Sequence, residues 1–245
     1  MRWTGPLESA ALLTVLRVPA GAAASTRGVL PWAPLVGLVL GGPAAGVAVA
    51  GTQLVSPLAG AVLFVAVLAA LTRGLHLDGL ADTADGLGPL RGRERALQVM
   101  RQGDVGPFGV VTLLLTVLLQ VACAATLLAA DGGWTALWAA PLVARLAMAR
   151  TGLPGVPMAA GSALGRSVAG TVSARWLAGW VFASAALLTV VDPALVPSAV
   201  AGLLAAELLL RRARTRLGGV TGDVMGAMGE TAAAATLLVA AAALP

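Results

Sequence analysis

Lysine, isoleucine, asparagine and tyrosine are absent from this 245-residue chain, which has one histidine, one cysteine and three phenylalanines. The single cysteine, Cys123, excludes an internal disulfide bond and a cysteine-based zinc cluster, so we expect it to pack as a small apolar side chain. Charge is also scarce. Only 11% of the residues are charged, whereas a typical soluble domain has about 25%. This scarcity of charge excludes an ordinary soluble domain.

Long apolar runs dominate the chain, which is 58% hydrophobic. A transmembrane helix needs about 20 apolar residues. Seven segments satisfy this roughly: 31–51, 54–72, 108–130, 134–150, 176–192, 194–210 and 231–245. We therefore expect an all-α fold, a polytopic helical bundle of about six or seven transmembrane helices, with residues 1–245 forming one domain in the lipid bilayer. Only Asp192-Pro193 separates the fifth and sixth segments, which form either a helical hairpin or one re-entrant element.

All sixteen basic residues are arginines, and their positions indicate a topology. If the N-terminus is inside, the inner segments are 1–30, 73–107, 151–175 and 211–230. These contain every arginine except Arg145 and Arg150, which lie near the inner end of the fourth span, while the outer loops carry only Asp131 and Asp192. This is the positive-inside pattern. It predicts a multi-pass protein of the cell membrane, and it explains the net charge of +5 without nucleic-acid binding.

Three of the eleven acidic residues lie close together after the second apolar run. Asp78, Asp82 and Asp85 are spaced by four and three residues, so a helix would place them on one face. Carboxylates so close repel one another unless a cation or protons neutralise them. Mg²⁺, which prefers oxygen ligands and often accompanies phosphates, suits such a stripe. The alternative is a solvated acidic loop that caps a membrane helix.

A second acidic cluster follows a glycine-rich turn near the C-terminus. Gly218, Gly219 and Gly222 precede Asp223, and Glu230 lies seven residues beyond Asp223. Such a turn, with arginine on one side and a carboxylate on the other, suits a phosphate–metal contact, although such turns also simply join spans. Both clusters fall in inner segments, so we expect them to face the cytosol, where they can meet over one site.

Three further residues have two interpretations each. His76 is either a proton acceptor or an interfacial hydrogen-bonding residue. Arg166 either contacts phosphate or holds its loop in place. Asp104 is a further ligand, a base, or the N-terminal cap of the third span.

The run from Gly74 to Leu87, Gly-Leu-His-Leu-Asp-Gly-Leu-Ala-Asp-Thr-Ala-Asp-Gly-Leu, resembles the signature of the cobalamin synthase family. Other matching segments follow in the expected order: Arg17-Val18-Pro19, Pro34-Leu35-Val36-Gly37, Met100-Arg101, Gly106-Pro107-Phe108-Gly109 and Gly218-Gly219-Val220-Thr221-Gly222-Asp223. The resemblance runs from about residue 12 to residue 230.

This resemblance implies a transferase that joins adenosylcobinamide-GDP to α-ribazole, or to its 5′-phosphate, and releases GMP. Displacement at a pyrophosphate requires positioned substrates and neutralised charge, which metal ions held by carboxylates can supply. The candidate Mg²⁺ ligands are Asp78, Asp82, Asp223 and Glu230. Asp85 either completes that set or accepts the nucleophile's proton, for which His76 is the other candidate. The candidate substrate contacts are Arg101, Arg166 and Gly222.

Two other classes remain open at this point. One is a different Mg²⁺-dependent membrane enzyme, such as a CDP-alcohol phosphotransferase or a prenyltransferase. The other is an ion-coupled transporter. Transporters place functional charges near the midplane of broken helices, whereas these acids fall beyond the inner ends of the spans. A homo-oligomer is also open.

Overall fold

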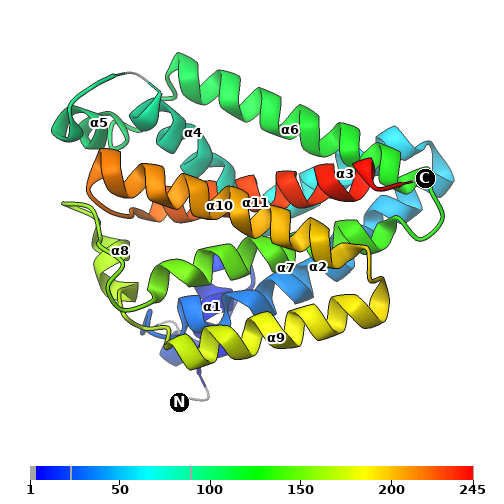
Figure 1. Cartoon of the computed structure of the whole chain (residues 1–245), viewed down its shortest axis with the longest axis horizontal. Coiled ribbons are helices and arrows are strands. Elements are labelled where there is room, and N and C mark those ends of the chain that lie inside the picture. Colours follow the sequence, from blue (N-terminus) through cyan, green and yellow to red (C-terminus); the bar gives the residue numbers. More distant parts are fainter. Residues whose placement is uncertain (1–3, 23, 89, 245) are drawn as a thin grey trace.

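The computed structural model describes residues 4–22, 24–88 and 90–244, which are mostly helical (Figure 1). The helices, in chain order, are α1 (Gly5–Leu13), η1 (Ala20–Ala22), α2 (Val29–Leu54), α3 (Pro57–Leu71), α4 (Leu75–Leu87), α5 (Arg93–Val99), α6 (Pro107–Leu128), α7 (Trp134–Ala149), η2 (Arg150–Gly152), α8 (Ala163–Val168), α9 (Ala174–Val191), α10 (Leu195–Leu217) and α11 (Gly222–Ala242). Within those ranges β-pairing is limited to one isolated bridge, between Met158 and Val220. The predicted all-α class is confirmed.

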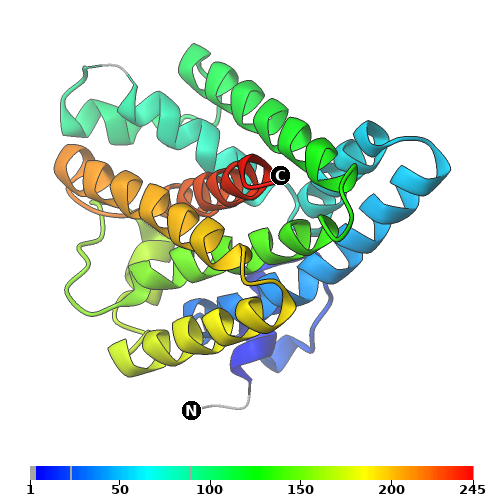
Figure 2. The same cartoon turned by 45° about the vertical axis from the view of Figure 1, so that its right-hand side comes forward.

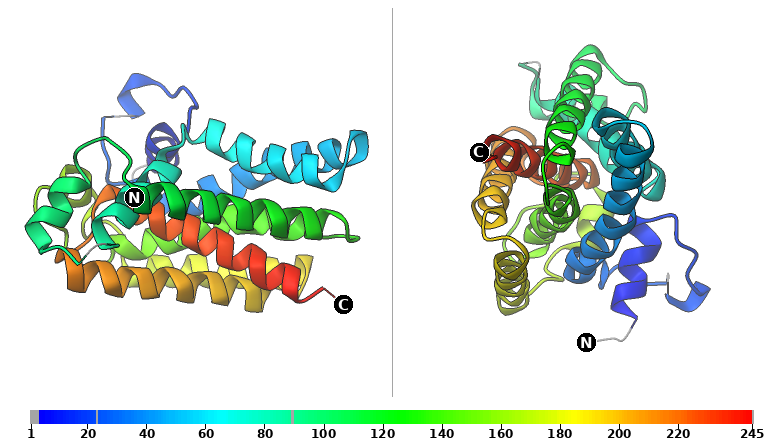
Figure 3. Two further views of the ribbon diagram at one scale, coloured as in Figure 1. Left: turned by 90° about the horizontal axis from the view of Figure 1, so that it is seen from above. Right: turned by 90° about the vertical axis from the view of Figure 1, so that its right-hand side faces the viewer.

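Helices α7 and α11 form the centre of the bundle. Helix α7 packs between α2 and α11, and α11 also packs against α10, α4 and α6. Figure 2 shows this arrangement, and the end-on view in Figure 3 places α9 at the edge. Small residues allow the central helices to approach closely, as is usual in membrane bundles. A Cβ atom on Gly37 of α2 would collide with the carbonyl oxygen of Pro141 of α7, and one on Gly41 with that of Trp138.

Four helices, α2, α6, α9 and α11, are long and apolar enough to cross a membrane, and the bent pair α3–α4 makes up to five. Helices occupy all seven predicted segments, but α7 has only 16 residues and α10 ends in a run of arginines. The outer faces are apolar: Leu115 and Leu118 of α6 and Phe182 of α9 are all more than 60% exposed. Cys123 is buried, as predicted. Such outer faces fit a lipid environment.

The charged residues gather at one end of the bundle, here called the basic end. It comprises the N-terminal ends of α2, α6, α9 and α11, the C-terminal ends of α7 and α10, and the connecting segments with α5 and α8 (Figure 1). The opposite end carries Asp131 and Asp192 in its connections. The arginine pattern in the sequence is therefore a feature of the three-dimensional structure.

The last helix begins earlier than the sequence suggests. The predicted span was 231–245, but α11 starts at Gly222. Asp223 thus lies in the first turn of a long helix and Glu230 lies inside it. Glycine and acidic residues lower the hydropathy of 222–230, so the apolar pattern does not extend into this segment. Packing against the other helices nevertheless stabilises it as a helix. By contrast, α9 and α10 do form the hairpin that was one of the two alternatives for that region.

Candidate functional site

The acidic stripe lies on a helix, as its spacing predicts. Helix α3 ends at Leu71, the backbone turns at Arg73 and Gly74, whose φ angles are 57° and 66°, and α4 leaves at 91° to α3. This turn directs α4 away from the axis of α3, and α4 leads to α5 at the basic end (Figure 1). Along α4, Asp78 is exposed, Asp82 is half-buried and Asp85 is buried.

The two acidic clusters meet where α4 packs against the start of α11. A Cβ atom on Gly79 would lie 2.8 Å from the carbonyl oxygen of Asp223 and 2.9 Å from its Cα atom, so glycine is required for this approach. Burial, together with the charges of Asp78, Asp223, Asp85 and Asp104, raises the pKa of Asp82 from 3.8 to about 6. The predicted juxtaposition of the α4 stripe with Asp223 is thus present, and the carboxylates repel one another.

Asp85 accepts hydrogen bonds from the N-terminal end of α6. Its two carboxylate oxygens accept hydrogen bonds from the amides of Gly106 (2.7 Å) and Gly109 (3.0 Å) at the N-terminus of α6. The partial positive charge of that helix end stabilises a buried carboxylate. A Cβ atom on either glycine would collide with the carboxyl group. The Gly106-Pro107-Phe108-Gly109 segment and Asp85 therefore form one structural unit.

This finding also corrects the alternative in which Asp104 caps the third span. The N-cap of α6 is Gly106, and no side chain caps the helix from that position. Asp104 lies in the exposed segment before the helix. The free amides at this helix end are satisfied by Asp85, which is distant in sequence and so could not be identified from local capping patterns.

The glycine-rich turn positions Asp223 through contacts on both sides. Gly218, with φ of 79°, ends α10. Gly219 lies so close to the backbone of Met158 and Ala159 that a Cβ would come within 2.6 Å of both. Thr221 then caps α11 by accepting from the amide of Val224 (3.2 Å), and its hydroxyl donates to the Asp223 carboxylate (3.1 Å).

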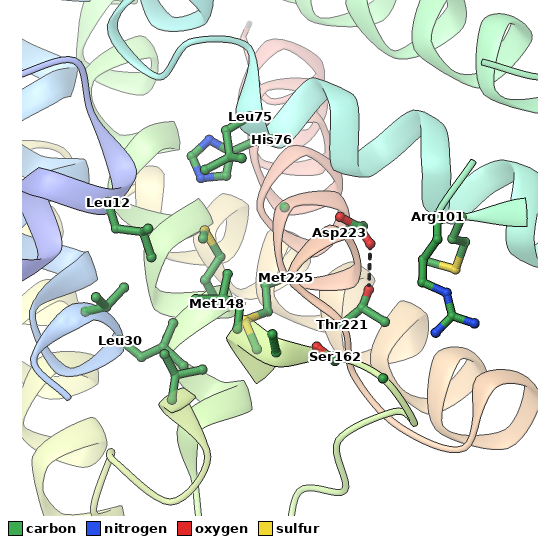
Figure 4. A pocket seen from close by; sticks show the side chains of 18 of the residues that line it. Leu12, Leu30, Leu75, His76, Arg101, Met148, Ser162, Thr221, Asp223 and Met225 are labelled. Carbon is green, nitrogen blue, oxygen red and sulfur yellow. Dashed lines mark hydrogen bonds between the residues drawn. The ribbon is translucent and has the colours of Figure 1, made fainter. Parts of the chain in front are cut away.

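A cavity of about 260 Å³ opens beside this turn (Figure 4). Its polar lining comes from four segments: His76, Arg101, Ser162 and the run Thr221–Asp223. Most of the rest is apolar. In Figure 4, Arg101, Thr221 and Asp223 lie at one side of the cavity and Leu12 and Leu30 at the other. The cavity therefore has a polar end beside the acidic clusters and an apolar end.

Among the predicted substrate contacts, Arg101 and Gly222 both line this cavity. The guanidinium of Arg101 lies against Gly161, whose φ of 81° belongs to the turn before α8. Arg166 is on α8 and exposed, and it is not among the lining residues although its neighbours Ser162 and Leu164 are.

Glu230 lies apart from Asp223. Its carboxylate accepts a hydrogen bond from Gln120 of α6 (2.9 Å). Together with Arg145 of α7, these two residues line a second, much smaller cavity of about 30 Å³ between the helices. Glu230 follows Asp223 by seven residues, about two helical turns, which carries it into the bundle.

Sequence reasoning missed the partners of these groups. Arg145, which is buried, lies 3.4 Å from Nδ1 of His76, and Gln120 holds Glu230. Their signal was present: a cation and an amide, each inside an otherwise apolar run, indicate a buried polar contact. Ser162, which caps α8 and lines the large cavity, carried no such signal.

A closed metal site does not appear in the part of the chain that the structure describes. No three histidine, cysteine, aspartate or glutamate side chains there lie close enough together to hold an ion. What the structure does provide is the Asp223 carboxylate at one end of the cavity, with α4 and its acidic stripe packed against the start of α11 beside it.

Comparison with known proteins identifies relatives over most of the chain. Residues 6–241 match the family described as cobalamin-5-phosphate synthase. The chain is similar to the adenosylcobinamide-GDP ribazoletransferase of Frankia casuarinae, with 44% identity over 87% of this chain and 84% of the relative. It is also similar to proteins of the same name from a Nocardioides species, with 43% identity over 84% and 83% of the two chains, and from a Roseiflexus species, with 37% identity over 98% and 92%. No solved structure matches the chain.

Proposed function

The chain belongs to the cobalamin-5-phosphate synthase family, and we propose that it joins adenosylcobinamide-GDP to α-ribazole, or to α-ribazole 5′-phosphate, with release of GMP. The observation that carries the proposal is the close packing of α4, which bears the acidic stripe, against the Asp223 turn, which lines the polar end of one cavity. Family membership over 6–241 favours this reaction over the transporter and the other transferases.

The reaction is a displacement at phosphorus. A ribose hydroxyl of α-ribazole attacks the phosphorus that carries the cobinamide, a new P–O bond forms, and the bond to GMP breaks. The hydroxyl proton is lost and GMP departs with the bridging oxygen. Such transfers depend mainly on positioning and on charge neutralisation, so the protein needs cationic groups and helix ends near the pyrophosphate.

Two features of the polar end supply that environment. Arg101 presents a guanidinium, which suits phosphate oxygens because of its planar set of donors. Thr221 and Gly222 form the N-terminus of α11, a helix of 21 residues whose dipole favours an anion there. We assign Arg101 and Gly222 to phosphate binding.

We assign Asp78, Asp82 and Asp223 to Mg²⁺, with oxygen donors that suit this ion. Asp78 is exposed and the other two are half-buried, so an ion can reach them from solvent. To share one ion the three side chains would have to turn toward it, since they do not lie close enough together as they stand. The raised pKa of Asp82 supports the assignment, because a cation would relieve the repulsion that causes it. A bound Mg²⁺ would neutralise developing charge on the phosphates. Glu230 and Arg166, which lie away from this end of the cavity, are not part of the proposed set.

Asp85 has a different task in this proposal. Since both of its oxygens already accept amide hydrogen bonds, it ties α4 to α6 and holds the stripe in place. We therefore propose a positioning role for Asp85 in place of both predicted alternatives, a metal ligand and a proton acceptor.

We further propose that the basic end, and with it the cavity, faces the cytosol across the cell membrane. The positive-inside bias supports this orientation, since every outer connection lacks arginine.

The test uses purified protein in detergent or liposomes. GMP release should require adenosylcobinamide-GDP, α-ribazole and a divalent cation, and chelation should stop it. Asp82→Asn should abolish release, whereas Asp131→Asn, at the opposite end of the bundle, should not. GMP release that does not depend on α-ribazole would indicate a hydrolase. Absence of GMP release by the wild-type protein would overturn the proposal.

A further inference from the structure

His76, in the first turn of α4, has one ring nitrogen engaged and one without a partner. The side chain is 2% exposed. Its Nδ1 lies 3.4 Å from Nη2 of Arg145. Its Nε2 atom is buried and has no hydrogen-bond partner among the described residues, and the residue lines the large cavity. Neither the carboxylates nor Arg101 at the polar end makes a hydrogen bond to the His76 ring.

Arg145 decides which ring nitrogen carries the proton. A guanidinium has only donors, so the nitrogen that faces it must accept. Arg145 is itself 4% exposed and held within α7, and Glu230 and Gln120 share a small cavity with it on its other side. With this contact as a hydrogen bond, Nδ1 is the acceptor, and the proton of the neutral imidazole lies on Nε2, a buried donor on a residue that lines the cavity.

The surroundings of that donor are apolar. Leucine, methionine and valine side chains make up most of the lining of the same cavity, among them Leu12, Leu30, Leu75, Met148 and Met225. In Figure 4, His76 lies between Leu12 and Asp223, that is, between the apolar side and the acidic turn. A single buried donor in an apolar wall selects a ligand with an apolar body and one acceptor, because an unsatisfied buried donor is costly.

We propose that this cavity binds the base of α-ribazole, with the Nε2–H of His76 donating to the unsubstituted ring nitrogen. The inference rests on the proposed function. The base is a dimethylbenzimidazole: flat, apolar, with one nitrogen acceptor opposite the nitrogen that carries the ribose. Its ring system packs among the leucines and methionines, and its ribose extends toward Asp223 and Arg101, where the pyrophosphate is attacked. His76 is a substrate-binding residue and Arg145 its positioning residue.

The first experiment examines the ring directly. His76 is the only histidine in the chain, so ¹⁵N-histidine labelling of tag-free protein gives one imidazole signal set. We expect the Nε2–H tautomer in the free protein and a shift of the Nε2 signal when α-ribazole is added. The analogue with carbon in place of the acceptor nitrogen should not cause this shift. An Nδ1–H tautomer, or no response to saturating α-ribazole, would overturn the inference.

The second experiment measures discrimination by GMP release at saturating adenosylcobinamide-GDP. The wild-type protein should prefer α-ribazole over the carbon analogue by on the order of ten- to a hundredfold in kcat/KM. His76→Leu should lose this preference by raising the KM for α-ribazole, with the KM for adenosylcobinamide-GDP unchanged. His76→Gln, which keeps a donor, should restore part of the preference. Gln98→Leu, on an exposed position of α5 outside the cavity, is the matched control.

The outcomes separate this inference from the reaction itself. GMP release by the wild-type protein without preference between the two nucleosides would refute the role of His76 and leave the reaction standing. A preference retained in His76→Leu would refute it as well. Absence of GMP release with either nucleoside would instead refute the proposed function.

Discussion

Gly79 offers the sharpest test of how the two acidic clusters are held together. The backbone of Asp223 lies against Gly79, and an added Cβ would be 2.8 Å from the Asp223 carbonyl oxygen and 2.9 Å from its Cα atom. Both atoms belong to the backbone of α11 and cannot rotate away as a flexible side chain would. In Gly79→Ala, therefore, α4 and α11 must move apart at this point.

The size of the effect follows from the distances. Ordinary contacts of a Cβ lie at 3.4–4 Å, so relief of the overlap displaces Asp223 relative to Asp78 and Asp82 by on the order of half an ångström to one ångström. A misplacement of this size lowers turnover by about a hundredfold. Overpacking also destabilises a helix contact by about 1–3 kcal/mol, from which the better helix propensity of alanine returns up to about 1 kcal/mol.

The assay compares Gly79→Ala with Gly46→Ala. Gly46 is also inside a helix, α2, and a Cβ there meets nothing within 4 Å. We expect GMP release to fall by about a hundredfold in Gly79→Ala and to stay at the wild-type rate in Gly46→Ala, with thermal unfolding confirming that both proteins fold. A wild-type kcat in Gly79→Ala would refute the argument that this contact positions Asp223.

Three further predictions concern Asp85, Asp82 and the orientation of the protein in the membrane. Asp85→Asn should lower the free energy of unfolding by about 1–3 kcal/mol, because it weakens the bonds to the Gly106 and Gly109 amides. It should reduce turnover less than Asp82→Asn does, and an inactive Asp85→Asn protein of unchanged stability would contradict the positioning role. In magnesium-free buffer, the pKa of Asp82, raised from 3.8 to about 6, means that the folded state binds this proton more tightly than the unfolded state. Stability should thus fall as the pH rises between these values, and a thermal unfolding series in which Asp82→Asn keeps the full pH dependence would contradict this origin. In a Cys123→Ala background, an impermeant thiol reagent applied to intact cells should label Asp131→Cys and not Leu90→Cys, whose site is 91% exposed at the basic end; the reverse pattern would invert the proposed orientation.

The positions of the membrane helices could be predicted from the sequence because they depend on local composition. A run of apolar residues forms a helix in lipid whatever its neighbours are, since every backbone polar group must be satisfied within the segment. The placement of Asp78, Asp82 and Asp85 on one face of α4 is equally local, because it follows from 3.6 residues per turn. The basic end follows from counting arginines.

Tertiary packing decided what each acidic residue does. Asp82 and Asp85 look alike in the sequence, yet Asp85 turns toward the amides at the start of α6, while Asp82 stays half-buried among other carboxylates. Asp223 and Glu230 were grouped because they are close in the chain, but two helical turns separate them, and Glu230 reaches Gln120 instead. These partners are more than twenty residues apart in sequence, so no local pattern could identify them.

The same holds for His76 and the cavity. From the sequence alone, both a proton acceptor and an interfacial residue were reasonable interpretations of a single histidine. The structure places Nδ1 beside Arg145, which lies 69 positions along the chain, and leaves Nε2 buried without a partner. The residue lines a cavity whose apolar side chains come from α1, α2, α4, α5, α7, α8 and α11. Local periodicity determines which residues share a helix face. The contacts between faces depend on how the helices pack together, and it is those contacts that determine the chemistry of this site.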